Sequence, residues 1–169
     1  MAFSLIPHRV YHSIYDIKPE ALAGAGIKLL LADLDNTLVP YGFPTATAEV
    51  RAWNESLRAQ GVKLFVLSNN RSATRAKRFA EDLGVPYLGH AGKPRPESFH
   101  KAMERMGCTA QETAMVGDQL FTDILGANNA RVRGLLVKPI AWGKNPMRIV
   151  RYAVETPFRA IGKRRNKPL

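Results

Sequence analysis

The sequence predicts an α/β fold of the Rossmann-like type, a three-layer sandwich in which helices cover both faces of a parallel sheet of about five strands. Short apolar runs of strand length alternate along the chain with longer segments of helical periodicity. Three of the helical segments end at a glycine, which is a common helix stop signal. Such alternation is typical of a parallel sheet, because parallel neighbours need a crossover connection between them.

The strands are expected at residues 27–33, 62–68, 85–89, 113–118 and 133–139. The first, IKLLLAD, is apolar throughout and follows Gly26, as expected of a strand that is buried on both faces. VKLFVLS, VPYLG and RGLLVKP have the same short apolar character. Thr109 and Glu112 have the spacing of a capping box, but the strand pattern of TAMVGD that follows favours a tight turn into the fourth strand.

The helices are expected at residues 46–60, 71–83, 96–106 and about 120–130. In the first of them Val50, Trp53 and Leu57 recur at helical spacing, and Gly61 ends the pattern. We expect three regions: a leader at 1–26 that packs on or near the core, a main domain at 27–140, and a basic C-terminal extension at 141–169. A chain of 169 residues is long enough for one compact domain.

The charge of the chain is strongly positive and is concentrated late. The formal net charge is +11, and residues 138–169 hold nine Lys and Arg residues against Glu155 alone, so this stretch contributes nine minus one, or +8. Such a stretch predicts contact with a polyanion, either an anionic phospholipid surface or nucleic acid. It is equally consistent with a terminal helix packed on the domain. Nucleic acid is the less favoured partner, because the tail has no recognisable binding module.

Targeting features favour a cytoplasmic protein. The N-terminal MAFSLIPHRVYHS meets His and Arg too early for a signal-peptide core, and no stretch approaches the roughly 20 apolar residues of a spanning helix. A peripheral position on the inner membrane face stays open, and so does the oligomeric state. The single cysteine, Cys108, excludes an intramolecular disulfide and a multi-cysteine zinc site.

Four polar residues fall at the ends of predicted strands or in the loops after them: Asp33, Ser68, Lys93 and Asp118. In open α/β sheets ligands bind outside the carboxyl ends of the strands, so these four side chains should converge. A lone Asp-x-Asp pair such as Asp33 and Asp35 is weak evidence, since solvated loop carboxylates are common. The ordered set is more informative than any one member.

The four segments DLDNTL (33–38), VLSNN (66–70), GKPRP (92–96) and VGDQLFTD (116–123) resemble, in order and spacing, the motifs of the haloacid dehalogenase superfamily of phosphohydrolases. The resemblance covers about residues 27–140. Within the superfamily, the sequence is similar to the small YqeG-type phosphatases and to phosphatidylglycerophosphate phosphatases. This resemblance implies that residues 27–140 form a phosphatase domain.

The resemblance also implies roles for individual residues. Asp33 would be the nucleophile that forms an aspartyl-phosphate, and Asp35 would protonate the leaving oxygen and later deprotonate water. Mg²⁺ would be held by a carboxylate oxygen of Asp33, the backbone carbonyl of Asp35, and Asp118. Thr37 would fix the loop geometry around Asp35.

Three further residues complete the expected site. The Ser68 hydroxyl and the backbone N–H of Asn69 would bind a phosphoryl oxygen, and Lys93 would neutralise the crowded carboxylates and phosphate. Asp123 would either assist Mg²⁺ through a water molecule or cap the helix near its start.

The motif spacing predicts an open site. Residues 38–67 and 69–92 are each nearly consumed by one helix and one strand, so neither interval has room for a cap domain. An open site favours a phosphate group carried by a macromolecule or by a headgroup at a membrane. The expected function is therefore Mg²⁺-dependent hydrolysis of a phosphomonoester, with phosphatidylglycerophosphate at a membrane surface as the favoured substrate. The alternatives are a phosphatase of phosphoprotein or nucleotide, and a basic nucleic-acid-associated protein with a vestigial phosphatase fold.

Overall fold

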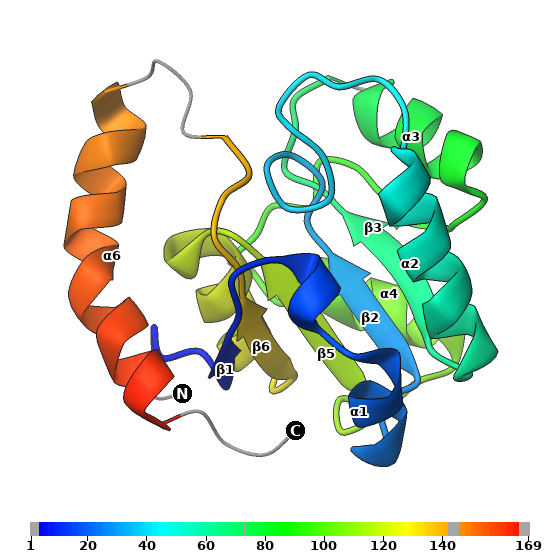
Figure 1. Ribbon diagram of the computed structural model, residues 1–169, viewed down its shortest axis with the longest axis horizontal. Helices are drawn as coiled ribbons and strands as arrows, with labels where there is room; N and C mark the ends of the chain where they lie inside the picture. The colour runs from blue at the N-terminus through cyan, green and yellow to red at the C-terminus, as the bar shows by residue number, and fades with distance from the viewer. Residues whose placement is uncertain (1–3, 73, 142–145, 166–169) are drawn as a thin grey trace.

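The computed structural model describes residues 4–72, 74–141 and 146–165, and its centre is one parallel sheet (Figure 1). The strands are β1 (Arg9–Val10), β2 (Leu29–Ala32), β3 (Lys63–Leu67), β4 (Tyr87–Leu88), β5 (Thr113–Gly117) and β6 (Arg133–Leu136). Their order in the sheet is β1-β6-β5-β2-β3-β4, and every pairing is parallel. The predicted α/β fold with a parallel sheet is confirmed.

Helices cover both faces of this sheet. The helical elements are a 3₁₀ turn (Ile14–Asp16), α1 (Pro19–Gly24), α2 (Ala48–Ala59), α3 (Arg75–Leu83), α4 (Glu97–Met106), a turn of π-helix (Leu120–Ile124), α5 (Leu125–Asn129) and α6 (Pro146–Arg165). The apolar sides of α1, α2 and α3 pack on one face, for example through Leu22, Trp53 and Phe79. The apolar sides of α4 and α5 pack on the other, through Phe99 and Ala127. The result is the expected three-layer arrangement.

The sheet has one strand more than the five that the sequence indicates. The leader supplies β1, whose Arg9 and Val10 lie in register with Leu135 and Leu136 of β6. A two-residue strand has no detectable alternation, and its partner is more than a hundred residues away in the sequence. Elsewhere in the leader, Leu5, Ile14, Ile17 and Leu22 are buried. The leader is thus a structural part of the domain.

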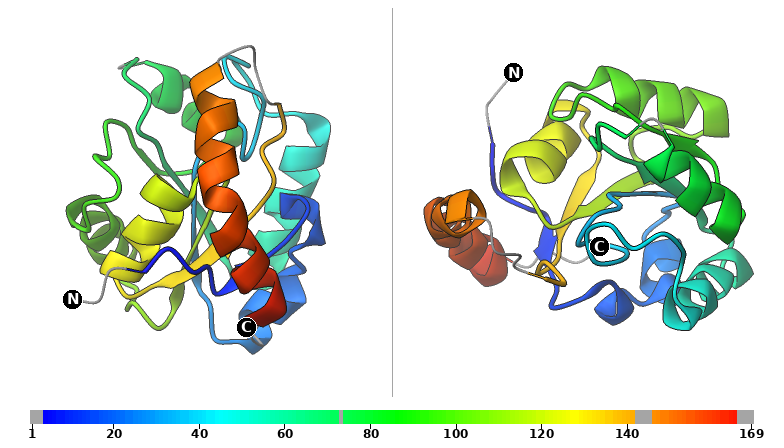
Figure 2. Two further views of the ribbon diagram at one scale, coloured as in Figure 1. Left: turned by 90° about the vertical axis from the view of Figure 1, so that its left-hand side faces the viewer. Right: turned by 90° about the horizontal axis from the view of Figure 1, so that it is seen from above.

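The C-terminal helix α6 lies beside the β1 edge of the sheet (Figure 2). Its Phe158 packs with Leu5 and Leu120, which belong to the leader and to the π-turn. Among the residues that the structure describes, no helix is both long enough and apolar enough to cross a bilayer. Val154 and Ile161 of α6 are exposed large apolar residues.

The carboxyl ends of β2, β3 and β5 form an uncovered rim. The interval after β2 contains one loop, α2 and β3, and the interval after β3 contains one loop, α3 and β4. Across the described residues of both intervals, no inserted domain covers the rim (Figure 1). The predicted absence of a cap therefore holds for the described chain.

Candidate active site

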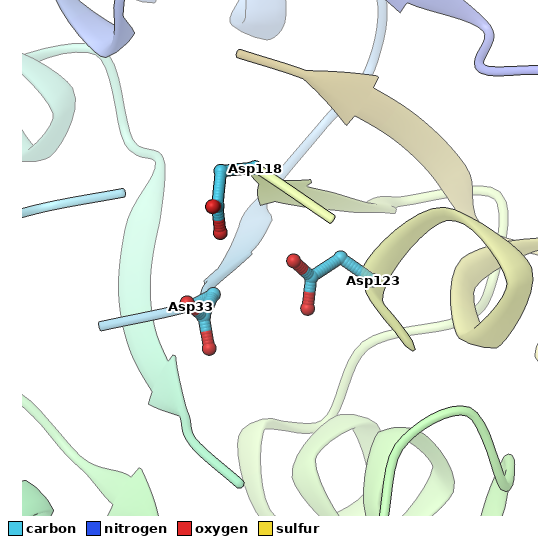
Figure 3. Close-up of side chains that lie close together, drawn as sticks. All are labelled: Asp33, Asp118 and Asp123. Atoms are coloured by element: carbon cyan, nitrogen blue, oxygen red, sulfur yellow. The ribbon is translucent and has the colours of Figure 1, made fainter. Parts of the chain in front are cut away.

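Three aspartates meet at the carboxyl end of the sheet. Asp33 directly follows β2, Asp118 directly follows β5, and Asp123 lies in the π-turn after it. All three are buried, and each offers a carboxylate oxygen within 4.8 Å of the others. Figure 3 shows their carboxylates directed toward a common space. The sheet order explains the meeting, since β2 and β5 are hydrogen-bonded neighbours.

Lys93 supplies the countercharge from inside the protein. Its Nζ donates to Asp33 Oδ1, to Asp123 Oδ1 and to the carbonyl of Leu67, each at 2.7 Å. The ammonium group therefore links the ends of β2 and β3 to the π-turn. The Lys93 side chain is only 1% exposed, so these contacts replace its hydration completely. This position accords with the neutralising role expected for Lys93.

Burial and the neighbouring charges shift both groups of this pair. Burial raises the pKa of Asp33 to about 6; the Lys93 ammonium opposes this rise, and the nearby Asp123 and Asp35 carboxylates add to it. Burial disfavours the charged form of Lys93, but the carboxylates of Asp123 and Asp33 outweigh this effect and raise its pKa above the ordinary value. Near neutral pH Asp33 is ionised and Lys93 is protonated.

The loop after β2 is held by its own side chains. Thr37 Oγ1 lies 3.5 Å from Asp33 Oδ2 and 3.4 Å from Asp118 Oδ1, so this hydroxyl bridges the two carboxylates. This bridge between Asp33 and Asp118 is additional to the role expected for Thr37 in fixing the loop around Asp35, which stays a prediction. Buried Asn36 adopts a left-handed conformation with φ 67°, which Asn tolerates better than most residues, and its side chain accepts from Tyr41 N.

Asp35 has two partners, Asn70 and Arg75, to which the sequence analysis assigns no role. Asn70 Nδ2 donates to Asp35 Oδ2 at 2.6 Å, and Arg75 of α3 donates to Asp35 Oδ1 at 2.8 Å through Nη2 and at 3.2 Å through Nε. Arg75 also donates to the carbonyl of Phe43 in the loop after β2. The Asp35 side chain remains 13% exposed, which leaves it accessible from the rim. Asp35 is thus held in a fixed orientation beside the buried cluster.

Ser68 and Asn69 follow β3 at the same rim. Ser68 is buried, and its Oγ accepts from Asn70 N at 3.1 Å, which leaves the hydroxyl proton available to another acceptor. The Asn69 side chain exchanges two hydrogen bonds of 2.9 Å with the backbone of Lys93. This link, which fixes the loop that carries Lys93, is additional to the backbone role predicted for Asn69.

Both carboxylate oxygens of Asp123 accept hydrogen bonds from the protein. Its Oδ1 accepts from Lys93, and its Oδ2 accepts from Gln119 N at 3.1 Å, at the start of the π-turn. A Cβ added to Gly117 would lie 2.2 Å from Asp123 Oδ2, so only glycine lets the carboxylate approach this closely. π-turns inside helices are frequent at functional sites. Asp123 therefore combines a backbone cap with a place in the acidic cluster.

The acidic cluster fits a divalent cation. Three aspartate side chains gather beside one ammonium group in a buried space, and carboxylate oxygens are the ligands that hard divalent cations take. Asp33 and Asp118 each have an oxygen in this space. Asp123 already gives one oxygen to Lys93 and the other to a backbone N–H, which places it in a supporting position.

The comparisons with known proteins agree with this geometry. The family model of haloacid dehalogenase-like hydrolases matches residues 42–131. The chain is 37% identical over 136 residues to the probable phosphatase YqeG of Bacillus subtilis (strain 168), covering 80% of this chain and 78% of that protein.

Two weaker similarities concern a lipid phosphatase and a solved structure. The chain is 29% identical over 153 residues to phosphatidylglycerophosphate phosphatase 1, chloroplastic, of Chlamydomonas reinhardtii, which covers 86% of this chain but 57% of that protein. The cobalt-bound deoxy-D-mannose-octulosonate 8-phosphate phosphatase of Haemophilus influenzae has the same fold, with a TM-score of 0.52 at 17% identity over 84% of this chain and 93% of that one. With the matched family model and the similarity to YqeG, this evidence shows that the chain belongs to the haloacid dehalogenase-like hydrolases and is an enzyme of their phosphatase type.

Proposed function

We propose that this protein hydrolyses a phosphomonoester with the aid of Mg²⁺ and through an aspartyl-phosphate formed on Asp33. One observation carries the proposal: a buried, ionised carboxylate at the end of β2 lies beside a lysine and two further aspartates at an uncovered rim. An ionised Asp33 can attack phosphorus, and covalent capture divides one difficult displacement into two easier ones. Lys93 keeps one Asp33 oxygen in place by a short hydrogen bond.

Each neighbouring residue has a task in this reaction. Asp35, oriented by Asn70 and Arg75, would give a proton to the leaving oxygen and take one from the water that hydrolyses the intermediate. The Ser68 hydroxyl would donate to a phosphoryl oxygen. Asp33 and Asp118 would hold Mg²⁺ with the Asp35 carbonyl, and the bound cation would offset charge on the phosphoryl group.

The test of the reaction is phosphate release from an aryl phosphate. The Asp33→Asn variant keeps the shape of the side chain but removes the nucleophile, so turnover should fall to the background rate. The matched control is Asp16→Asn. Asp16 lies in the leader, where its side chain accepts a hydrogen bond from Ser13 N. Turnover by Asp33→Asn at the wild-type rate would refute an intermediate on this residue.

We infer further that the physiological substrate is phosphatidylglycerophosphate on an anionic membrane. The similarity to a phosphatidylglycerophosphate phosphatase supports this substrate, as do the open rim and the cationic C-terminal stretch. Basic residues near an anionic surface contribute about 1 kcal/mol each. Lys163 and Arg164 lie exposed on α6, beside the exposed apolar side chain of Ile161. Such a surface can bring the enzyme to a headgroup that an uncovered site can accept.

The substrate is tested with vesicles that contain phosphatidylglycerophosphate, compared with a soluble phosphomonoester. We expect faster release from vesicles, and a selective loss of that advantage in the double variant Lys163→Glu, Arg164→Glu. The soluble ester serves as the control, because both side chains are exposed on α6 and neither belongs to the acidic cluster, so its hydrolysis should not change. Turnover on vesicles no better than on soluble esters would defeat the lipid assignment and favour a phosphoprotein or nucleotide.

A further inference from the structure

Helix α6 buries an ion pair although it belongs to the most basic part of the chain. Glu155 and Arg159 are one helical turn apart, with Arg159 Nη2 2.9 Å from Glu155 Oε2, and both residues are buried. Burying a charged pair carries a large desolvation cost, which is offset only where additional hydrogen bonds satisfy both groups. The partners that supply those hydrogen bonds therefore show what the pair does.

The partners are backbone groups of the loop that carries Asp118. Arg159 Nη2 donates to the Asp118 carbonyl at 2.6 Å, and Nη1 lies 3.5 Å from the carbonyl of Val137, just after β6. Glu155 Oε1 accepts from Leu120 N at 3.2 Å, at the first residue of the π-turn. The pair thus holds the backbone on both sides of Gln119, between the end of β5 and the turn that contains Asp123.

The position of α6 is itself closely defined. Gly162 approaches the leader so tightly that an added Cβ would lie 2.5 Å from Pro7 Cγ and 3.1 Å from Val10 Cγ2. Val10 belongs to β1, which pairs with β6. Figure 2 shows α6 running alongside this edge of the sheet. The helix is therefore seated on the leader at one end while its buried pair reaches the Asp118 loop.

We propose that Glu155 and Arg159 are positioning residues for the metal ligand Asp118. The direction of the Asp118 carboxylate depends on the backbone that carries it, and the ion pair fixes that backbone at the Asp118 carbonyl and the Leu120 amide. Groups that orient metal ligands typically change metal affinity by about 10- to 100-fold when they are removed. This inference rests on the proposed metal-dependent function, and it assigns part of the metal site to a helix outside the family's motifs.

The experiment measures metal binding directly, by calorimetric titration of the full-length protein with Mg²⁺ and with Mn²⁺. We expect Arg159→Met to raise the metal Kd by about tenfold or more. The conservative variant Arg159→Lys keeps a positive charge at this position but has fewer hydrogen-bond donors than arginine, so it should give an intermediate Kd. The matched control is Arg58→Met, which removes an exposed arginine of α2 that pairs with Glu55 and should leave the Kd unchanged.

Turnover of a soluble phosphomonoester provides the second readout. Positioning predicts that Arg159→Met needs a higher Mg²⁺ concentration for half-maximal turnover, while turnover at saturating Mg²⁺ stays close to wild type. If Arg159→Met does not fold, Glu155→Gln tests the same contact, because its amide cannot pair with both Arg159 and the Leu120 N–H as the carboxylate does. Wild-type Kd values in the folded variants would overturn the positioning role. Absence of metal binding by the wild-type protein would instead defeat the proposed function.

Discussion

Lys93 is the residue whose removal gives the largest measurable change in stability that we predict. In Lys93→Met, the Asp33 and Asp123 carboxylates lose the ammonium group 2.7 Å from each of them, and the Leu67 carbonyl loses its donor. The lysine side chain is 1% exposed and that of Asp123 is 1% exposed, so water cannot readily take its place. Removing one partner of a buried ion pair costs about 3–5 kcal/mol, which is the loss of unfolding free energy that we expect without divalent metal.

The assay is urea unfolding followed by circular dichroism, at pH 7, in the presence of a chelator and then of Mg²⁺. Added Mg²⁺ should stabilise Lys93→Met more than wild type, because the cation supplies part of the charge that the lysine provided. Lys28→Met is the matched control: Lys28 also contacts a carboxylate, Glu112 at 2.6 Å, but its side chain is 65% exposed, and its removal should have a much smaller effect. A loss of unfolding free energy of no more than about 1 kcal/mol for Lys93→Met would refute the reasoning, because removing one partner of a buried ion pair should cost more than this.

Two further outcomes follow from the same structure. Gly117→Ala should push Asp123 out of place, because the new Cβ would lie 2.2 Å from its carboxylate; we expect a loss of about 1–3 kcal/mol in urea unfolding, whereas Gly89→Ala, with its nearest neighbour at 3.8 Å, should be tolerated. The hydrogen bonds from Lys28 and from the main and side chain of Thr109 hold the pKa of Glu112 at about 2, below its usual 4.5. This stabilisation is fully present above pH 4.5 and declines as the pH falls through 2. The difference in unfolding free energy between wild type and Glu112→Gln should therefore shrink steadily between these two pH values, and a difference at pH 2 as large as that at pH 7 would contradict the assignment.

The strand pattern of the main domain could be predicted from sequence because its strands are buried on both faces. Leu29, Leu30, Leu31 and Ala32 form an uninterrupted apolar run, which indicates a central parallel strand without any knowledge of its partners. β1 has no such signature. Its Arg9 and Val10 are only half-buried, and it forms by pairing with a strand distant in the sequence. Register with a remote partner leaves no local pattern to detect.

The candidate site was predictable where residues follow strands and was missed where they do not. Asp33, Ser68 and Asp118 come together because the ends of adjacent parallel strands lie side by side. Arg75 reaches Asp35 from the first residue of α3, and its reach depends on the path of the preceding loop. Arg159 stands in a run of basic residues, and such runs are usually solvated. Only the packing of α6 distinguishes this arginine from its neighbours.

The uncovered rim also bears on the kinetics of the enzyme. Many enzymes close a lid over each substrate, and the opening of that lid then limits turnover. Across its described residues this chain has no inserted domain at the rim, so no closure of that kind stands between substrate arrival and the proposed attack by Asp33. Discrimination between phosphoesters then cannot depend on a domain that closes over the substrate. Selectivity between substrates must then depend on which phosphoesters bind near the rim and on how long they stay bound there.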